Sequence, residues 1–429
     1  MCCEPPPLAV GRALRPSGGA GGVGVDTVPA VIPLEQAQHF VLSTVTRAQP
    51  VRVPRAEAVG RVLAVDVVAG DDVPPFDNTA VDGFAVRADD VAHVPADLTV
   101  VATVAAGDHT DRVLGAGEAI RIMTGAPMPA GADAVVMVED SEMVSDDVVR
   151  LSAAVPAGAA VRRAAEDVAA GDTVLSAGTE ITPAVLGVLA TINVHEVDVF
   201  PAPRVAVAST GDELVVTDVP LLPGQIRESN RPMLLAALRD AGCEVTDLGV
   251  IPDDEDRLAE VLTAAAGTHD AVVTSGGVSM GDFDVVKAVL GRIADMTWMQ
   301  VAIKPAKPFA FGVLDGTPVF GLPGNPVSSL VSFEMFARPA LRAMAGHERL
   351  SRPSVVAIVD DDLGRGPDGK THLMRVQAHF ADDGRCHVVP VRAQGSHQLA
   401  ATATATAIAV VPDGDGLPAG SEVAVLLLR

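Results

Sequence analysis

Between Arg204 and Gly346, short runs of apolar, β-branched residues alternate with helical stretches, and this alternation limits the possible folds more than any other feature of the sequence. The segments RVAVAST, VTDLGV, AVVT and PVFGL are typical of buried strands. Helices are predicted between and after these strands, with start and stop signals that bound them at about residues 230–242, 256–267, 284–293 and 325–345. Strands and helices in this order predict a mostly parallel sheet that is covered by helices on both faces.

The segments on either side of this region follow different patterns. Residues 33–48 place their apolar side chains on one face of a predicted helix. From Asp71 to about Val155, turn residues are dense and apolar runs such as IRIM and AVVMV are short, which predicts a compact β-rich insertion. From Arg352 onward we expect five short strands in a small β barrel or sandwich. One of them is predicted in ATATATAIAVV, because its period of two suits a half-buried strand.

Together these patterns predict a multidomain fold of the α/β plus β class. The N-terminal stretch is rich in Pro and Gly and lacks a basic start ahead of a continuous apolar run, so we expect a disordered leader rather than a signal peptide. The predicted boundaries are a leader over 1–28, a discontinuous linking domain of helices and strands over 29–70 and 156–200, the β-rich insertion over 71–155, the sheet domain over 201–347 and the C-terminal β domain over 348–429.

The charge balance excludes several classes of partner. Lys and Arg number 31 against 55 Asp and Glu, and the formal net charge of −24 disfavours binding to nucleic acid or to an anionic membrane. Tyr is absent and Trp298 is the only Trp, so aromatic platforms for bases are not expected. The four Cys lack CxxC spacing, and no apolar run reaches the ~18 residues that cross a bilayer. We therefore expect a cytoplasmic protein with neither a membrane nor a nucleic-acid partner.

Ligands of a mostly parallel sheet bind at the carboxyl ends of its strands. The loops predicted at that edge cover residues 209–213, 253–254, 274–284 and 321–328. Gly276, Gly277 and Ser279, with the helix start after Asn325, form a candidate cradle for a phosphate. A junction of this kind is nevertheless more often only a tight turn, and these loops contain neither GxGxxG nor GxxxxGK[ST].

The charged residues near these loops indicate two different ligands. The acids would repel an anion unless a divalent cation bridges them to it, and they are Asp212, Glu213, Asp253, Asp254, Asp282 and Asp284. The alternative is that several of these acids only cap helices. Lys304 and Lys307 lie three residues apart in AIKPAKPFAFG, where two Pro stiffen the chain, and two ammonium groups held together would concentrate an oxyanion. Taken alone, such a pair is more often solvated surface.

Eight segments together resemble the molybdopterin molybdenumtransferase family, which includes the E domain of gephyrin. They follow the family's order from about residue 33 to residue 400: DNTAVDGFAVR, IRIMTGAPMPAGADAVVMVED, VRRAAED, STGDEL, TSGGVSMGDFD, AIKPAKPFAFG, GLPGNPVS and QGSHQL. Each segment alone is moderately specific, whereas their ordered combination is very specific. The resemblance implies a three-layer αβα molybdopterin-binding domain, a β-rich inserted domain and a C-terminal domain that is similar to a β barrel.

The resemblance also implies a reaction, catalysed by a transferase that depends on Mg²⁺. Molybdate is inserted into the dithiolene of adenylylated molybdopterin, AMP is released, and molybdenum cofactor is formed. The implied partner is a second copy of the chain, in a homodimer whose active sites combine the insertion of one subunit with the sheet domain of the other. Molybdopterin adenylyltransferase and enzymes that accept the cofactor are further implied partners.

Site residues follow from their positions in the family's motifs. The catalytic positions match Asp82, Thr124, Arg162, Asp167, Glu213, Asp253 and Asp284, and the metal positions match Glu213, Asp253 and Asp284. On the pterin and nucleotide side, the substrate positions match Ser209, Thr210, Gly276, Gly277, Ser279, Pro323, Gly324, Asn325 and Pro326. On the molybdate side they match Lys304, Lys307, Arg375 and Ser396.

Three positions depart from the family's pattern. Gln300 stands where relatives can carry Lys, and Phe84 stands where Tyr is common. Glu228 replaces an Asp of many members; it either binds metal differently or only caps a helix. Two other functions stay open, namely a non-catalytic molybdopterin-binding carrier or scaffold and an unrelated nucleotide-binding α/β enzyme such as a phosphotransferase. The metal-holding acids and the lysine pair count against the carrier, and the lack of a P-loop lysine counts against the phosphotransferase.

Overall fold

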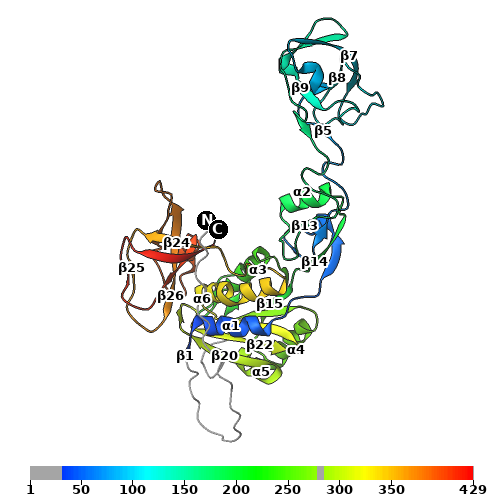
Figure 1. The fold of residues 1–429 in the computed structure, drawn as a ribbon. Coiled ribbons are helices and arrows are strands. Elements are labelled where there is room, and N and C mark those ends of the chain that lie inside the picture. The colour runs from blue at the N-terminus through cyan, green and yellow to red at the C-terminus, as the bar shows by residue number, and fades with distance from the viewer. Residues whose placement is uncertain (1–30, 278–284, 429) are drawn as a thin grey trace, which may run out of the picture.

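The computed structural model describes residues 31–277 and 285–428 and shows an elongated chain of four parts (Figure 1). A β-rich insertion lies at one end, and a small linking domain follows it. A helix-covered sheet and a C-terminal barrel lie next to each other at the other end, where a strand of the sheet domain pairs with a strand of the barrel. No helix in the two described ranges is both long and apolar enough to span a membrane.

The sheet of the helix-covered domain has seven strands. Their order is β1–β20–β22–β23–β19–β15–β18, and their bounds are Val31–Ile32, Asp295–Val301, Pro308–Leu314, Thr317–Leu322, Ala271–Ser275, Arg204–Thr210 and Glu244–Ile251. The four strands from β23 to β18 are parallel, whereas β22 runs antiparallel to both of its neighbours. The parallel strands therefore end at a common edge, at Thr210, Ile251, Ser275 and Leu322.

Helices cover both faces of this sheet (Figure 1). One face carries α1 Leu34–Thr44, α3 Asn230–Asp240, α6 Pro326–Ser332 and α7 Arg338–Met344, and a π-helical turn over Phe333–Ala337 joins the last two. The other face carries α4 Glu255–Ala266 and α5 Val285–Ile293. Alternate residues of β15 point to opposite faces, so Val205 and Val207 enter the first core while Ala206 and Ala208 enter the second. The three-layer αβα architecture is thus confirmed.

The first described segment belongs to the sheet domain. β1 pairs in parallel with β20, which places Val31 opposite Gln300 and Ile32 opposite Val301. α1 buries Ala37 and Val41 in the core that it shares with α3 and α7. The predicted linking domain over 29–70 therefore needs correction at residues 31–44, because the apolar face of α1 is covered by the sheet domain.

The linking domain is small, and the insertion is a separate β domain. In the linking domain, β14 Glu196–Phe200 pairs with β2 Val51–Pro54 and β3 Val62–Leu63, β4 Val67–Val68 pairs with β13 Thr173–Leu175, and α2 spans Pro183–Thr191. The insertion is built on the sheet β10–β11–β7–β8–β6–β9, with bounds Ser141–Met143, Val148–Leu151, Ala96–Val104, Glu118–Ile122, Gly83–Val86 and Ala134–Met137. A ladder of β5 Asn78–Thr79 and β12 Val161–Arg162 lies between the two parts.

The C-terminal domain is a closed five-stranded barrel. Its strands pair in the order β26–β27–β24–β30–β28, and β28 pairs again with β26; their bounds are Thr371–Phe380, Cys386–Pro390, Ser354–Val359, Glu422–Leu427 and Ala407–Val411. A short ladder joins β25 Leu363–Gly364 to β29 Gly416–Leu417 in this domain, and another joins β16 Leu214–Val215 to β17 Ile226–Arg227 in the sheet domain. β21 Ile303–Lys304, from the sheet domain, pairs with β26 and places Lys304 opposite His372.

One barrel strand starts later than the sequence pattern predicts. Leu399–Thr402 forms the short helix α8, and β28 begins only at Ala407. The hydroxyls of Thr402 and Thr404 donate to backbone oxygens of residues 398 and 401, at 3.4 and 2.9 Å. The prediction of a strand over the whole of ATATATAIAVV is therefore wrong in its first half, because Ala favours helix and Thr hydroxyls satisfy nearby carbonyl groups.

Candidate functional site

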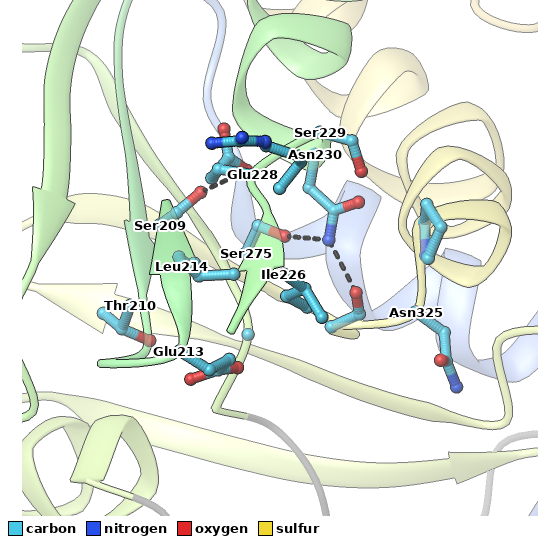
Figure 2. A pocket seen from close by; sticks show the side chains of 14 residues that line it. Ser209, Thr210, Glu213, Leu214, Ile226, Glu228, Ser229, Asn230, Ser275 and Asn325 are labelled. Atoms are coloured by element: carbon cyan, nitrogen blue, oxygen red, sulfur yellow. Dashed lines mark hydrogen bonds between the residues drawn. The ribbon is translucent and has the colours of Figure 1, made fainter. Parts of the chain in front are cut away.

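A pocket of about 360 Å³ opens at the common edge of the parallel strands (Figure 2). It is lined by Ser209, Thr210, Glu213, Leu214, Ile226, Arg227, Glu228, Ser229, Asn230, Ser275, Gly276, Gly324, Asn325 and Pro326. The structure thus brings together seven residues assigned from the sequence, namely Ser209, Thr210, Glu213, Gly276, Gly324, Asn325 and Pro326. Gly277 follows directly in the chain, and Pro323 is buried in the loop between β23 and α6. Ser279 and Asp284 lie outside the described residues.

Asn230 ties the loops of this pocket together. Its side-chain Nδ2 donates to Ser275 Oγ at 2.9 Å and to the Gly324 oxygen at 2.7 Å (Figure 2). Its Oδ1 is buried and has no hydrogen-bond partner among the described residues. Asn230 is the first residue of α3, at the start expected for the helix predicted over about residues 230–242, and Ser229 holds the cap position. Sequence reasoning missed this bridging role, because it depends on two loops that are distant in the chain.

Glu228 acts as a local structural acid. Its Oε1 accepts hydrogen bonds from the Arg231 backbone N–H at 2.8 Å and from Ser209 Oγ at 3.1 Å. Its side chain is only 2% exposed, and its Oε2 lies 3.7 Å from Arg231 Nε. Accepting from an N–H three residues ahead is the geometry of a helix cap. Of the two roles left open by the sequence, the contacts favour capping: from the residue before Ser229, the Glu228 carboxylate accepts from an N–H in the first turn of α3.

Glu213 folds back over the chain that precedes it. Gly211 has a φ of +139°, and a Cβ built there would lie 2.8 Å from the carboxyl carbon of Glu213. This conformation is rare for residues with side chains. A glycine at position 211 therefore leaves the space in which the Glu213 carboxylate lies against the wall of the pocket.

Two acidic loops meet beside the pocket. The backbone N–H of Asp212 donates to Asp253 Oδ2 at 3.4 Å, and the N–H of Asp253 donates to Asp212 Oδ1 at 3.2 Å. Asp253 does not line the pocket, but these bonds hold it on the loop next to Glu213. Asp254 instead caps α4, since its side chain accepts from the Arg257 N–H at 2.8 Å.

Only some of the acids assigned to the metal are seen in positions where they can bind a hard cation. Glu213 and Asp253 offer carboxylate oxygens, which Mg²⁺ prefers. The third acid assigned to the metal, Asp284, lies outside the described residues. Within residues 31–277 and 285–428, no group of three or more His, Cys, Asp or Glu side chains is placed to hold a metal ion.

A second cavity, of about 510 Å³, adjoins the first and shares Asn325 with it. Lys304 and Lys307 line it from the loop after β20, and Ser396 lines it from the barrel. The Ser396 backbone oxygen accepts from the Val327 N–H of α6 at 3.0 Å, which fixes the barrel loop against the sheet domain. Gln300 is buried in β20 and does not line this cavity.

The second cavity also contains residues that the sequence analysis did not single out. Lys370 and His397 both line it, from separate segments of the C-terminal domain. No motif marks Lys370, because it lies in a turn rather than in a recognisable segment. The signal that points to it is the scarcity of its residue type: the chain has 27 Arg but only four Lys.

Arg375 lies behind the wall of the lysine-lined cavity. It is only 1% exposed, and its guanidinium donates to the backbone oxygens of Ala393 and Gly395 at 2.6 and 3.3 Å. Burial lowers its pKa. Its Nε and one terminal nitrogen have no partner among the described residues. In this arrangement, Arg375 holds the loop that carries Ser396.

The four residues assigned in the insertion and in the segment that follows it lie away from both cavities. Asp82 Oδ1 accepts from both the backbone N–H and the hydroxyl of Thr124, each at 2.7 Å, and these bonds lower the pKa of Asp82. Arg162 and Asp167 are exposed near the junction with the linking domain. The insertion lies at the opposite end of the chain from the sheet (Figure 1), so one chain does not bring these residues to its own pocket. Phe84 is 2% exposed, in the core of the insertion.

Comparisons with known families cover nearly all of the described chain. Residues 32–193 match the family described as "MoeA N-terminal region (domain I and II)". Residues 206–343 match "Probable molybdopterin binding domain", and residues 364–428 match "MoeA C-terminal region (domain IV)". The molybdopterin biosynthesis moeA protein from Pyrococcus horikoshii has a similar structure, with a TM-score of 0.78 and 31% identity, over 93% of this chain and 100% of that one.

Curated relatives are similar over comparable lengths. Molybdopterin molybdenumtransferase 2 of Mycobacterium tuberculosis is 41% identical over 390 residues, which cover 89% of this chain and 95% of that protein. The molybdopterin molybdenumtransferase of Haemophilus influenzae is 37% identical over 370 residues, which cover 86% and 91%. On these matches, in sequence and in structure, the chain belongs to the molybdopterin molybdenumtransferase family.

Proposed function

We propose that this chain inserts molybdate into adenylylated molybdopterin, releases AMP and forms molybdenum cofactor. The observation that carries the proposal is a pair of adjoining cavities that share Asn325 and differ in charge. The pocket at the sheet edge offers glycine backbone and Glu213, whereas the second cavity offers Lys304 and Lys307. A pterin that carries a nucleotide and a small dianion can therefore bind next to each other. The names of the curated relatives describe the same activity.

The pocket at the sheet edge is the proposed site of the pterin and its phosphates. Gly276 has a φ of +99°, and a Cβ there would lie 3.0 Å from the Thr210 backbone oxygen, so only glycine lets the two loops approach this closely. Asn325 precedes α6 without using its side chain as a cap, and the side chain is exposed (Figure 2). Its amide is therefore free to bind a ligand at the boundary between the two cavities.

The charged groups have separate proposed roles. Lys304 and Lys307 would hold molybdate, because ammonium groups make charge-assisted hydrogen bonds to oxyanions. Glu213 and Asp253 would hold Mg²⁺, since both supply oxygen donors from adjoining loops. When bound, Mg²⁺ would neutralise charge on the phosphate as AMP leaves.

Release of AMP tests the proposal directly. The purified protein should release AMP from adenylylated molybdopterin in the presence of Mg²⁺, and the rate should rise with added molybdate until it saturates. Chromatography of the nucleotide products measures this. Tight binding of the adenylylated pterin without any release of AMP would contradict the proposal and would favour the carrier instead.

We further propose a cytoplasmic homodimer with composite active sites. The support is geometric: Asp82 and Thr124 form an exposed, hydrogen-bonded pair at the far end of the chain from the pocket (Figure 1). In an isologous dimer, the insertion of one subunit can reach the sheet domain of its partner. Molybdopterin adenylyltransferase would supply the substrate, and enzymes that use the cofactor would accept the product.

Mixing two inactive variants should restore activity if the sites are composite. Asp82→Asn disables the insertion, and Glu213→Gln disables the sheet domain. Each mixed dimer then keeps one site with both native residues, so random reassociation should recover about a quarter of wild-type AMP release. The measurement is AMP release after the two variants are co-expressed and purified together. A mixture as inactive as its components would place Asp82 and Glu213 in the site of a single chain.

Replacing Gly211 with alanine should slow AMP release by displacing Glu213. The new Cβ would contact the Glu213 carboxylate, and a shift of about 1 Å at a catalytic group lowers rates by up to about a hundredfold. Gly224→Ala is the matched control, because Gly224 also has a positive φ, of +88°, but a Cβ there meets no atom within 4 Å. Steady-state rates of both variants would be compared with wild type, and equal losses would show that backbone strain alone is responsible.

A further inference from the structure

Three of the four lysines of this chain line one cavity. Lys304, Lys307 and Lys370 all contribute to the wall of the second cavity, whereas the fourth lysine, Lys287, lies in α5. Arginine is the usual cation elsewhere, with 27 residues. The three lysines come from two domains, which the pairing of β21 with β26 holds together. This concentration of a rare residue type sets the cavity apart from the rest of the molecule.

The wall of this cavity lacks acids, although the protein is acidic. Of the residues that the structure describes there, none is Asp or Glu, in a chain that has 55 of them and a net charge of −24. Within the described part of the chain, Lys304 and Lys307 also form no ion pair. The cavity is therefore a local region of positive potential, which selects small anions over cations and neutral molecules.

The loop that carries Lys370 is held rigidly. Arg365, whose side chain is 1% exposed, donates to the Lys370 backbone oxygen at 2.6 Å and to Asp368 Oδ1 at 2.9 Å. Asp413 accepts from the backbone N–H groups of Asp368 and Gly369 at 3.0 and 3.1 Å. The position of Lys370 is thus set before any ligand binds, which reduces the entropy lost on binding.

Asp368 forms an ion pair with Lys370 and orients its side chain. Lys370 Nζ lies 3.2 Å from Asp368 Oδ2, and the same carboxylate contacts His372 and Arg365. Burial alone would raise the pKa of Asp368, but the bonds from His372 and Lys370 lower it to about 2. Asp368 occupies one side of the Lys370 ammonium, which has three N–H donors and therefore retains donors for a second acceptor.

We propose that Lys370 is a third cationic ligand for the tetrahedral dianion, alongside Lys304 and Lys307. The inference rests on the proposed function, because it takes that dianion to be molybdate. Lys304 and Lys307 lie on one loop and would bind the oxyanion from one side, and Lys370 would bind it from the side of the barrel. The barrel therefore supplies part of the anion site itself, in addition to the Ser396 loop.

The first experiment measures the molybdate dependence of AMP release. Lys370→Met keeps the length and apolar stem of the side chain and removes its charge, so half-maximal release should need about tenfold more molybdate. Lys370→Arg should recover most of the wild-type dependence. Arg385→Met is the matched control, because it removes one positive charge from the same domain at an exposed ion pair with Glu422, and its molybdate dependence should not change.

The second experiment needs no variant and so does not depend on Lys370→Met folding. Wild-type protein is acylated with an amine-directed reagent, with and without molybdate, and each lysine is quantified by mass spectrometry. Molybdate should protect Lys370 together with Lys304 and Lys307. Protection of Lys304 and Lys307 with no change at Lys370, and AMP release intact, would overturn the inference and leave the proposed function standing. Protection of all three without AMP release would support the anion site and contradict the proposed function.

Discussion

Replacing Lys304 and Lys307 together with alanine should raise the molybdate concentration for half-maximal AMP release by about a hundredfold or more, since each charge-assisted hydrogen bond contributes ~1.5–3 kcal/mol. Neither lysine has an ion-pair partner in the described part of the chain, so the substitution leaves no carboxylate there without a partner that it had before. The loss should therefore fall on binding of the dianion rather than on stability. Affinity for the adenylylated pterin should change little, because the other cavity holds it.

The measurement is a titration of AMP release with molybdate, paired with calorimetric binding of the nucleotide substrate. Arg150→Ala with Arg385→Ala is the matched control, since it removes two positive charges from surface ion pairs with Asp97 and Glu422. That control should retain the wild-type dependence on molybdate. A double lysine variant with the same dependence would remove the oxyanion assignment from this cavity.

Replacing Glu213 with glutamine should reduce the rate of AMP release by about a hundredfold, with the substrate still bound. The amide has nearly the shape of the carboxylate, so it can still lie over Gly211 and should not disturb the pocket. It loses the charge with which Glu213 would hold Mg²⁺ beside Asp253. The variant should therefore also need more Mg²⁺ than wild type for half of its maximal rate.

The measurement is AMP release at several Mg²⁺ concentrations, with substrate binding followed separately. Glu260→Gln makes the same chemical change on the exposed face of α4, where Glu260 pairs with Arg257, and should behave as wild type. A Glu213→Gln variant with an unchanged rate and an unchanged need for Mg²⁺ would show that this acid has no part in the reaction.

Much of the sheet domain is predictable because its signals are local. Apolar runs predict the strands, and Asn325 followed by Pro326 marks the start of α6. The rule that ligands bind where parallel strands end then leads to the pocket. The resemblance in motifs adds the identity of the ligands, which the spacing of Gly and Asp residues alone leaves open.

The misses involve contacts between distant segments. β1 and α1 join a sheet whose other strands begin after residue 200, and no local pattern shows this pairing. The ATATAT segment has the period of a strand but lacks large side chains; its first residues end the helix α8 at Thr402, and the strand begins only at Ala407. Asn230 bridges two loops and Lys370 faces a cavity between two domains, and both roles exist only once the chain has folded.

The pairing of β1 with β20 also has a consequence for how the chain acquires its structure during synthesis. Val31 and the apolar face of α1 leave the ribosome long before Gln300 has been made, and the insertion and linking domain emerge in between. Domains generally fold as they are synthesised, so the insertion and the linking domain can become native first. Until the rest of the sheet domain has been made, α1 lacks the strands and helices against which it packs. Closing so long a loop is slow, so the edge of the sheet where β1 pairs with β20 should be among the last regions to become native.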